Sequence, residues 1–389
     1  MGFEDFYGNA GVVNRLRESI GAGRFPQSLI LAGPRGAGKY KLALMLAQAV
    51  NCLHPPAPGS LPDFCGVCAN CIRIGGTADL EARVAEAVQA REEMREADKR
   101  ETRILLQTHP DVLVIPPDPP QMLIKLGQVR QAIHVAYYRP PVEARRAFTI
   151  FTSASFMKEA VNSLLKLLEE PPAHSSLVLL ADNPQELPPT IRSRAGIYRL
   201  GAVSAVELEE LLARRRPELS VADRALTARL AEGTVGRALT LDLGGYLASR
   251  QEALLILRSA LCEPGTSAGR SSSAGQEPDD SALFRATESY RAGADGQEKT
   301  LRLLRALSRL VEDLLLIVAG SPHLIRNLDL ESELSRMAQD SALTVDWIGQ
   351  AAEALVQVEQ GMRRNLLRSL SLDAMAFALR RDAGSFALP

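Results

Sequence analysis

Short, continuous apolar runs alternate with helical patterns of apolar residues over the first half of the chain. Within each run, apolar and polar positions do not alternate, which is typical of strands buried on both faces of a parallel sheet. Because helical stretches separate the runs, the pattern predicts an α/β domain with a parallel sheet. The predicted strands are Ser28–Ala32, Val112–Ile115, Ala147–Thr152, Leu177–Ala181 and Ile197–Leu200.

After Leu200 the sequence has no further strand pattern and helical spacing takes over. Breaks at Pro217 and Gly233 indicate a small domain of three helices, followed by an all-α region. A stretch rich in Gly, Ser and Pro predicts a flexible loop over 263–281, and mixed charges predict a solvated helical insert over 78–107. The expected domains are an α/β domain over 1–201, a three-helix lid over 202–244 and a helical oligomerisation domain over 245–389.

The composition is that of a soluble globular protein, with 46% hydrophobic and 23% charged residues in 389. The net charge of −1 gives no overall basic field, so any DNA contact must come from a local patch or from partners. No apolar segment is long enough for a membrane span, and the N-terminus has no signal pattern. These features predict a cytoplasmic protein without membrane contacts.

A glycine-rich segment, Gly33–Tyr40, follows the first predicted strand and precedes a helical pattern. This order of strand, loop and helix is the context of a phosphate-binding P-loop, in which backbone amides and the helix N-terminus face the phosphate. Tyr40 occupies the position where Ser or Thr normally holds Mg²⁺. The candidate nucleotide-binding residues are Gly33, Gly36, Gly38 and Lys39.

The degenerate loop allows three interpretations. A chance glycine turn is disfavoured by the strand and helix around it. We favour an empty or structural loop, because the Mg²⁺-holding hydroxyl is missing. Arg35, Lys39 and the loop amides could still hold a phosphate without Mg²⁺, so the sequence leaves binding of ATP or ADP open.

Four of the five cysteines cluster within one short segment. Two consecutive C-x-x-C pairs and one cysteine upstream offer four thiolates, the ligand set of a closed structural zinc site. A redox C-x-x-C pair and an iron–sulfur cluster are the alternatives, and His54 could replace one ligand. The predicted zinc ligands, in a module over 52–71, are Cys52, Cys65, Cys68 and Cys71.

The P-loop and cysteine knuckle, together with motifs further along the chain, resemble the bacterial DNA polymerase III clamp loader, an AAA+ family. The most specific motif is Asn162–Pro172, which looks like that family's N-A-L-L-K-T-L-E-E-P-P segment. The resemblance covers residues 3 to about 240. Its other motifs are His109–Asp111, Gln128–Arg130, Asn183–Arg194 and Gly233–Leu239.

The family contains gamma and tau motor subunits, which hydrolyse ATP, and a delta-prime subunit that generally does not. A motor carries Asp-Glu at the end of the third predicted strand, where Asp holds Mg²⁺ and Glu orients water. This chain has Thr152 and Ser153 there. The resemblance therefore implies a delta-prime-type subunit without intrinsic ATPase activity. The alternatives are a divergent gamma/tau-type motor and an unrelated repair or recombination ATPase, and Leu164–Pro172 disfavours the latter.

The resemblance also implies roles for two arginines. Ser193-Arg194 matches the arginine-finger motif, which in this family reaches into the neighbouring subunit's nucleotide site. The alternatives are that Arg194 forms a salt bridge within its own domain or that Arg192 is the finger. Arg237 lies in the sensor-2 segment and would contact phosphate or link the lid to the main domain. The implied partners are gamma/tau and delta subunits in a hetero-pentameric ring, with a sliding clamp and primed DNA.

Overall fold

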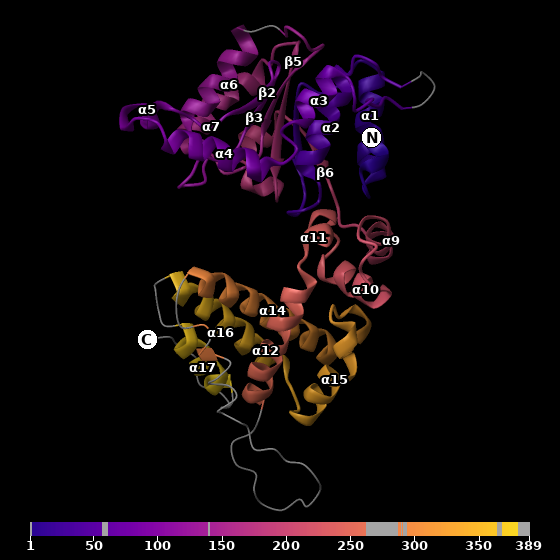
Figure 1. Ribbon diagram of the computed structural model, residues 1–389, viewed down its shortest axis with the longest axis vertical. Coiled ribbons are helices and arrows are strands. Elements are labelled where there is room, and N and C mark those ends of the chain that lie inside the picture. Colours follow the sequence, from indigo (N-terminus) through magenta and orange to yellow (C-terminus); the bar gives the residue numbers. More distant parts are fainter. Residues whose placement is uncertain are drawn as a thin grey trace, which may run out of the picture. The chain divides into compact units, whose positions relative to one another are not determined.

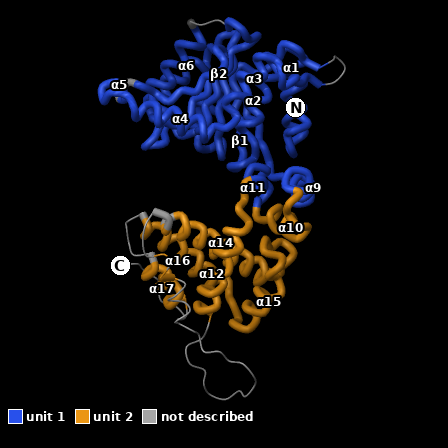
Figure 2. The backbone as a smooth tube through the Cα atoms, in the orientation of Figure 1, with its two compact units in different colours: residues 1–216, 231–239 blue, residues 217–230, 240–389 orange. Residues whose placement is uncertain are grey.

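The computed structural model describes residues 2–56, 61–138, 141–261, 287–288, 290, 294–363 and 368–379. These residues form two compact units, which Figure 2 shows in different colours. The first unit comprises residues 1–216 and 231–239, and the second comprises 217–230 and 240–389. The predicted flexible loop, 263–281, lies outside the described residues.

The first unit is built on a six-stranded sheet, whose strands are β1 (Ser28–Ala32), β2 (Leu106–His109), β3 (Val112–Ile115), β4 (Ala147–Phe151), β5 (Ser175–Ala181) and β6 (Gly196–Arg199). The strand order is β2-β3-β4-β5-β1-β6. All neighbouring strands are parallel except β2 and β3, which are antiparallel. The predicted α/β fold with a mainly parallel sheet is thus confirmed.

The two edge strands differ from the sequence prediction. β2 was not predicted, because exposed Gln107 and Thr108 separate its buried end residues and interrupt any apolar run. β6 was predicted as buried on both faces, which is wrong, since Gly196, Ile197 and Arg199 are exposed. As the last strand of the order, β6 has a neighbour on one side only.

Helices cover both faces of the sheet, as Figure 1 shows. Successive side chains of a strand point to opposite faces. Leu29 and Leu31 of β1 therefore pack in one core with α1 (Ala10–Gly21) and α2 (Lys39–Asn51). Ile30 and Ala32 pack in a second core, on the other face, with α6 (Leu126–Tyr138) and α7 (Lys158–Glu169).

The other α-helices before β6 are α3 (Ala69–Gly75), α4 (Leu80–Glu92), α5 (Glu96–Glu101) and α8 (Pro189–Arg192). α4 begins after Asp79, whose carboxylate accepts a hydrogen bond from the Ala82 amide, and none of its residues is buried. Arg91 of α4 pairs with the fully buried carboxylate of Asp118 at 2.5 Å. This ion pair attaches the charged helix to the α/β core.

Three helices follow β6, and they are α9 (Ala205–Arg215), α10 (Val221–Leu230) and α11 (Val235–Thr240). α9 starts with a capping box, in which Ser204 and Glu207 satisfy each other's backbone amides. By contacts, α9 and nearly all of α11 belong to the first unit, and α10 belongs to the second. The three-domain division at 201 and 244 stays a prediction.

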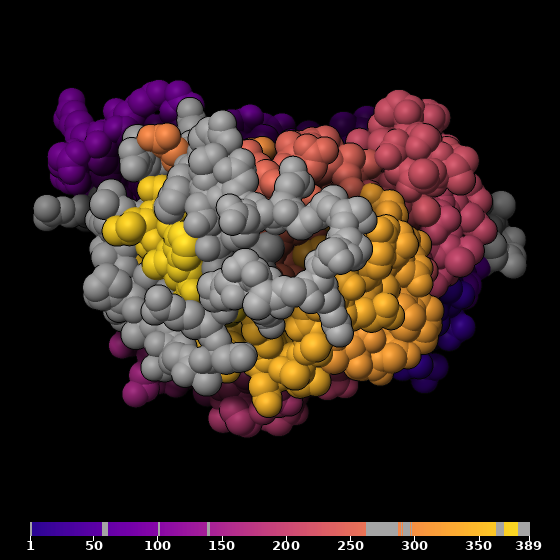
Figure 3. Space-filling view, turned by 90° about the horizontal axis from the view of Figure 1, so that it is seen from below, coloured from indigo at the N-terminus to yellow at the C-terminus, as the bar shows by residue number. Residues whose placement is uncertain are grey.

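The second unit is helical, and no strand occurs after β6 in the described part of the chain. Its longer helices are α12 (Leu243–Leu261), α14 (Ala294–Val318), α15 (Glu331–Asp340), α16 (Val345–Arg363) and α17 (Arg368–Leu379). Apolar side chains from these helices form one core. Figure 3 shows a face on which atoms of the later helices, coloured orange to yellow, lie at the surface.

Inside this helical unit, the Asp313 carboxylate is fully buried. It accepts hydrogen bonds from the backbone amides of Arg326 and Asn327 at 2.8 and 3.0 Å, and from the Asn327 side chain at 2.7 Å. Asp313 thereby fixes the segment between α14 and α15. Among the helices that the structure describes, none has the length and apolar character required to cross a bilayer.

Candidate functional site

The glycine loop lies between β1 and α2, as the sequence predicted. Gly36 and Gly38 have φ angles of +84° and +86°, a region that residues with a Cβ rarely adopt. Gly38 is the N-cap of α2, which begins at Lys39. The first amides of this helix have no partner within it, which is the arrangement that favours an anion.

The Lys39 ammonium is bound by groups of the chain itself. Its Nζ donates to the carbonyl oxygens of Gly33 and Pro34 at 2.5 and 3.1 Å, and to Oδ1 of Asp182 at 2.7 Å. The second carboxylate oxygen of Asp182 accepts from Arg35 Nε at 2.9 Å. Burial opposes ionisation of Asp182, but the hydrogen bonds from Lys39 and Arg35 outweigh it and lower the pKa of this carboxyl.

Asp182 reaches Lys39 because of the sheet register. Ala181, at the end of β5, pairs with Ala32, at the end of β1. Asp182 and Gly33 are the residues that follow these two strand ends, so the carboxylate and the loop meet at the same edge of the sheet. Asp182 was not predicted from the sequence. Its signal was an acidic residue directly after a strand, but the neighbouring strand was unknown from the sequence.

The Tyr40 side chain points away from the loop. Its hydroxyl donates to the Thr77 carbonyl at 2.7 Å, and burial raises the pKa of Tyr40 to about 12. Thr152 and Ser153 follow directly after β4, and the Ser153 hydroxyl accepts a hydrogen bond from the Ser155 amide at 3.0 Å. These positions therefore offer no carboxylate to hold a metal ion or to orient water.

The segment around Arg237 packs against the glycine loop within the first unit. The Gly236 amide donates to the Gly36 carbonyl at 2.8 Å. Arg237 pairs with Glu232 at 2.6 Å, and this partner too was missed in the sequence analysis. The structure thus brings Gly33, Gly36, Gly38 and Lys39 into one loop with the Arg237 segment beside it.

Arg194 lies at the surface between α8 and β6. Its Nη2 is 2.8 Å from Oε1 of Glu169, and its Nη1 donates to the Thr190 carbonyl at 3.0 Å. Just over one third of the side chain is exposed. Arg192, the other candidate, donates to the Gln185 side chain and is less exposed than Arg194.

The four predicted zinc ligands converge. Cys52 follows the last residue of α2, Cys65 and Cys68 lie on the knuckle around Gly66, and Cys71 belongs to α3. Their sulfur atoms all lie within 4.8 Å of one another, and all four are free thiols. A zinc tetrahedron with bonds of about 2.3 Å has edges of about 3.8 Å, so this donor set fits such an ion.

Backbone amides support the thiol cluster. The Cys65 amide donates to the Cys52 sulfur, and the Cys68 amide donates to the Cys65 sulfur, each at 3.3 Å. Burial raises the pKa of the Cys52 and Cys71 thiols. Burial by itself would also raise the pKa of Cys68, but hydrogen bonds from the backbone amides of Cys71 and Leu53 outweigh this effect and lower the Cys68 pKa to about 6. A bound cation would stabilise all four thiolates.

A comparison with protein families gives a match along the α/β part of the chain. The family described as "DNA polymerase III, delta subunit" matches residues 8–204. The chain belongs to this family. It is related to the gamma/tau and delta-prime subunits of DNA polymerase III.

Individual relatives agree with the family match. DNA polymerase III subunit tau of Escherichia coli is 28% identical over 243 residues, covering 61% of this chain and 32% of that protein. Subunit gamma/tau of Mycobacterium tuberculosis is 28% identical over 212 residues, covering 54% and 31%. Subunit delta' of Pseudomonas aeruginosa is 27% identical over 198 residues, covering 51% and 50%. The matches span only about a third to a half of these relatives, and identity does not separate the two kinds of subunit.

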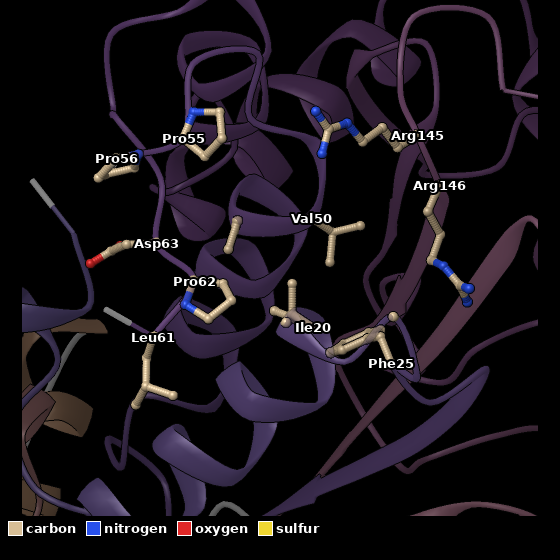
Figure 4. A pocket seen from close by; sticks show the side chains of 13 residues that line it. Ile20, Phe25, Val50, Pro55, Pro56, Leu61, Pro62, Asp63, Arg145 and Arg146 are labelled. Carbon is tan, nitrogen blue, oxygen red and sulfur yellow. The ribbon is translucent and has the colours of Figure 1, made fainter. Parts of the chain in front are cut away.

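The chain also has a cavity of about 590 Å³, away from its glycine loop. Figure 4 shows Ile20, Val50 and Phe25 at the cavity and Arg145 and Arg146 beside it. Phe25 precedes β1 and the two arginines precede β4, so the cavity lies at the amino ends of these strands, whereas the glycine loop follows β1. The Arg146 guanidinium donates hydrogen bonds to the Ser175 carbonyl and to the Ser176 hydroxyl, both on β5.

Proposed function

We propose that this chain acts as the delta-prime subunit of a DNA polymerase III clamp loader, a stator that does not hydrolyse ATP. The observation that carries the proposal is that three positions where a motor subunit binds Mg²⁺ and orients water have unsuitable side chains. Tyr40 is turned towards Thr77, and Thr152 and Ser153 replace the metal-binding and water-positioning carboxylates. Without these groups the chain lacks what phosphoryl transfer to water requires.

On this proposal, Arg194 acts in trans. It supplies the positive charge that stabilises the transition state of ATP hydrolysis in a neighbouring gamma/tau subunit. Its exposure in the segment between α8 and β6 supports this role, because a finger must reach across an interface. The partners would be gamma/tau and delta subunits in a hetero-pentameric ring that loads a sliding clamp onto primed DNA.

The division of labour would follow the predicted domains. Residues 1–201 form the AAA+ domain, 202–244 the lid and 245–389 the collar that holds the ring together. A zinc ion held by Cys52, Cys65, Cys68 and Cys71 would be structural, since the four thiolates leave no open coordination position. Its contribution would be to link the end of α2 to α3.

ATP turnover by the isolated full-length chain tests the proposal against the alternative of a divergent gamma/tau-type motor. We expect no turnover above background, with or without primed DNA, and no change in Lys39→Ala. Turnover that disappears in Lys39→Ala would reject the stator role and favour the motor. Co-purification with gamma/tau and delta subunits tests the proposed assembly independently.

A further inference from the structure

We propose that Asp182 closes the phosphate site of this chain by binding Lys39 and Arg35 in place of a phosphate group. Asp182 is then the residue that decides whether the glycine loop can accept nucleotide. The inference rests on the proposed function, because a stator subunit works without nucleotide in its own site. It identifies the group that keeps the site closed.

All the hydrogen-bond donors of the Lys39 ammonium have acceptors within the chain. An ammonium group has three N–H donors. Here the three acceptors are the carbonyl oxygens of Gly33 and Pro34 and the carboxylate of Asp182. Only about a tenth of the Lys39 side chain is exposed, so the ammonium cannot turn to solvent. A phosphate could bind Lys39 only by displacing one of these acceptors.

The Asp182 carboxylate resembles a phosphate group in how it binds the two cations. The two oxygens of Asp182 each accept from a different cation, 2.7 Å from Lys39 and 2.9 Å from Arg35. Paired oxygens with one cation each are also how a phosphate would be bound at this position. An incoming nucleotide would bring its negative charge beside the Asp182 carboxylate, and neighbouring like charges repel each other.

The segment packed against the glycine loop carries a third cation, Arg237. Arg237 is paired with Glu232 at 2.6 Å. Glu232 has a φ of +51°, a conformation that few residues other than glycine adopt. The three cations around the loop, Arg35, Lys39 and Arg237, therefore each have a carboxylate partner within the chain. Because Arg35 and Lys39 share Asp182, two carboxylates offset two of the three positive charges that would attract phosphate.

The test measures binding of ADP and ATP to the full-length chain by calorimetry, with and without Mg²⁺. We expect Asp182→Asn, which keeps the shape and removes the charge, to bind ADP at least about tenfold more tightly than wild type. Adding Lys39→Ala to that variant should return affinity to the wild-type level. Glu186→Gln is the matched control, because it removes an exposed carboxylate from the turn that follows Asp182, and it should bind as wild type does.

If a folded Asp182→Asn protein binds ADP with the same affinity as wild type, the proposed role of Asp182 is wrong. This holds whether wild type and variant both bind ADP weakly or both bind it tightly. If Asp182→Asn does not fold, the same tenfold criterion applies to Asp182→Ala. ATP turnover is recorded on the same samples. Turnover by wild type would refute the proposed stator function, whereas unchanged binding in the Asp182 variants would refute only the closure.

Discussion

Arg194 is paired with Glu169, with 2.8 Å between Nη2 and Oε1. Glu169 is the last residue of α7 and belongs to the Asn162–Pro172 motif, whereas Arg194 ends the Asn183–Arg194 motif. Two segments by which the sequence resembles the clamp-loader family therefore meet at one ion pair. The pair, together with the Thr190 carbonyl, holds the guanidinium at the surface in a defined position.

We predict that Arg194→Ala leaves the chain folded and able to assemble, yet strongly reduces the DNA-stimulated ATPase activity of the reconstituted complex. An exposed ion pair contributes at most about 1 kcal/mol to stability, whereas an arginine in trans accelerates phosphoryl transfer by orders of magnitude. ATPase rates and clamp loading measure the effect, and size-exclusion chromatography checks assembly.

Two variants serve as controls for Arg194→Ala. Arg192→Ala removes a neighbouring guanidinium that is bound to Gln185 and should reduce ATPase activity much less. Glu169→Gln removes the charge that orients Arg194 and should have an intermediate effect. Wild-type activity in the Arg194→Ala complex would make Arg194 a residue of the intradomain ion pair alone.

We predict one zinc ion per chain, bound by the four-cysteine cluster. Because the free energy of binding a structural metal contributes to folding, chelation should lower the melting temperature by more than about 5 °C. Metal analysis and thermal unfolding with and without a chelator measure these effects. Cys71→Ser should lose the metal, while Cys262→Ser, at the cysteine outside the cluster, should keep it. An iron chromophore, or no metal at all, would contradict this prediction.

Tyr40→Phe should destabilise the chain by about 1 kcal/mol, the usual net contribution of a hydrogen bond. The variant removes only the hydroxyl that donates to Thr77. Tyr137→Phe is the matched control: its hydroxyl donates to the Glu170 carbonyl at 2.7 Å from an exposed side chain, and its loss should cost less. Chemical unfolding of the three proteins provides the comparison, and equal stability of Tyr40→Phe and wild type would argue against a structural role of this bond.

Tyr40 also predicts a dependence of stability on alkaline pH. Burial raises its pKa to about 12, from an ordinary value of 10.0. The unfolded chain therefore loses the phenolic proton first, so the contribution of Tyr40 is complete below pH 10 and is lost as the pH rises towards 12. The decline of stability between these values should be shallower in Tyr40→Phe than in wild type. Parallel declines would mean that Tyr40 titrates normally.

In the helical unit, Asp313→Ala should destabilise by about 3 kcal/mol, because it leaves the partly buried amide of Arg326 and the buried amide of Asn327 without an acceptor. Asp340→Ala, at an exposed position on α15, should change stability by less than about 0.5 kcal/mol. Thermal unfolding distinguishes the two variants. Similar melting temperatures would show that water or other groups replace the Asp313 carboxylate.

The sequence predicted the central part of the α/β fold because buried parallel strands are continuous apolar runs. β1, β3, β4 and β5 satisfy that condition. β2 was missed because its middle residues face solvent, and the exposure of β6 was missed because burial at a sheet edge depends on which strands are neighbours. Strand order is a long-range property that no local pattern reports.

The same reason separates the predicted site residues from the missed ones. The loop glycines, Lys39 and the four cysteines are close in sequence and form recognisable spacings. Asp182 and Glu232 are ordinary acidic residues in their local context, and no local pattern names their partners. Glu169 lies within the Asn162–Pro172 motif, but its partner Arg194 belongs to a separate segment. Their roles depend on the register between β1 and β5 and on the meeting of α7 with α8.

Helix α2 begins at the glycine loop and ends one residue before Cys52. Its 13 residues span about 20 Å along the helix axis. The thiol cluster and the phosphate loop therefore flank one helix, although the sequence presents them as separate motifs. Removal of a bound metal and substitution in the loop would each perturb one end of α2.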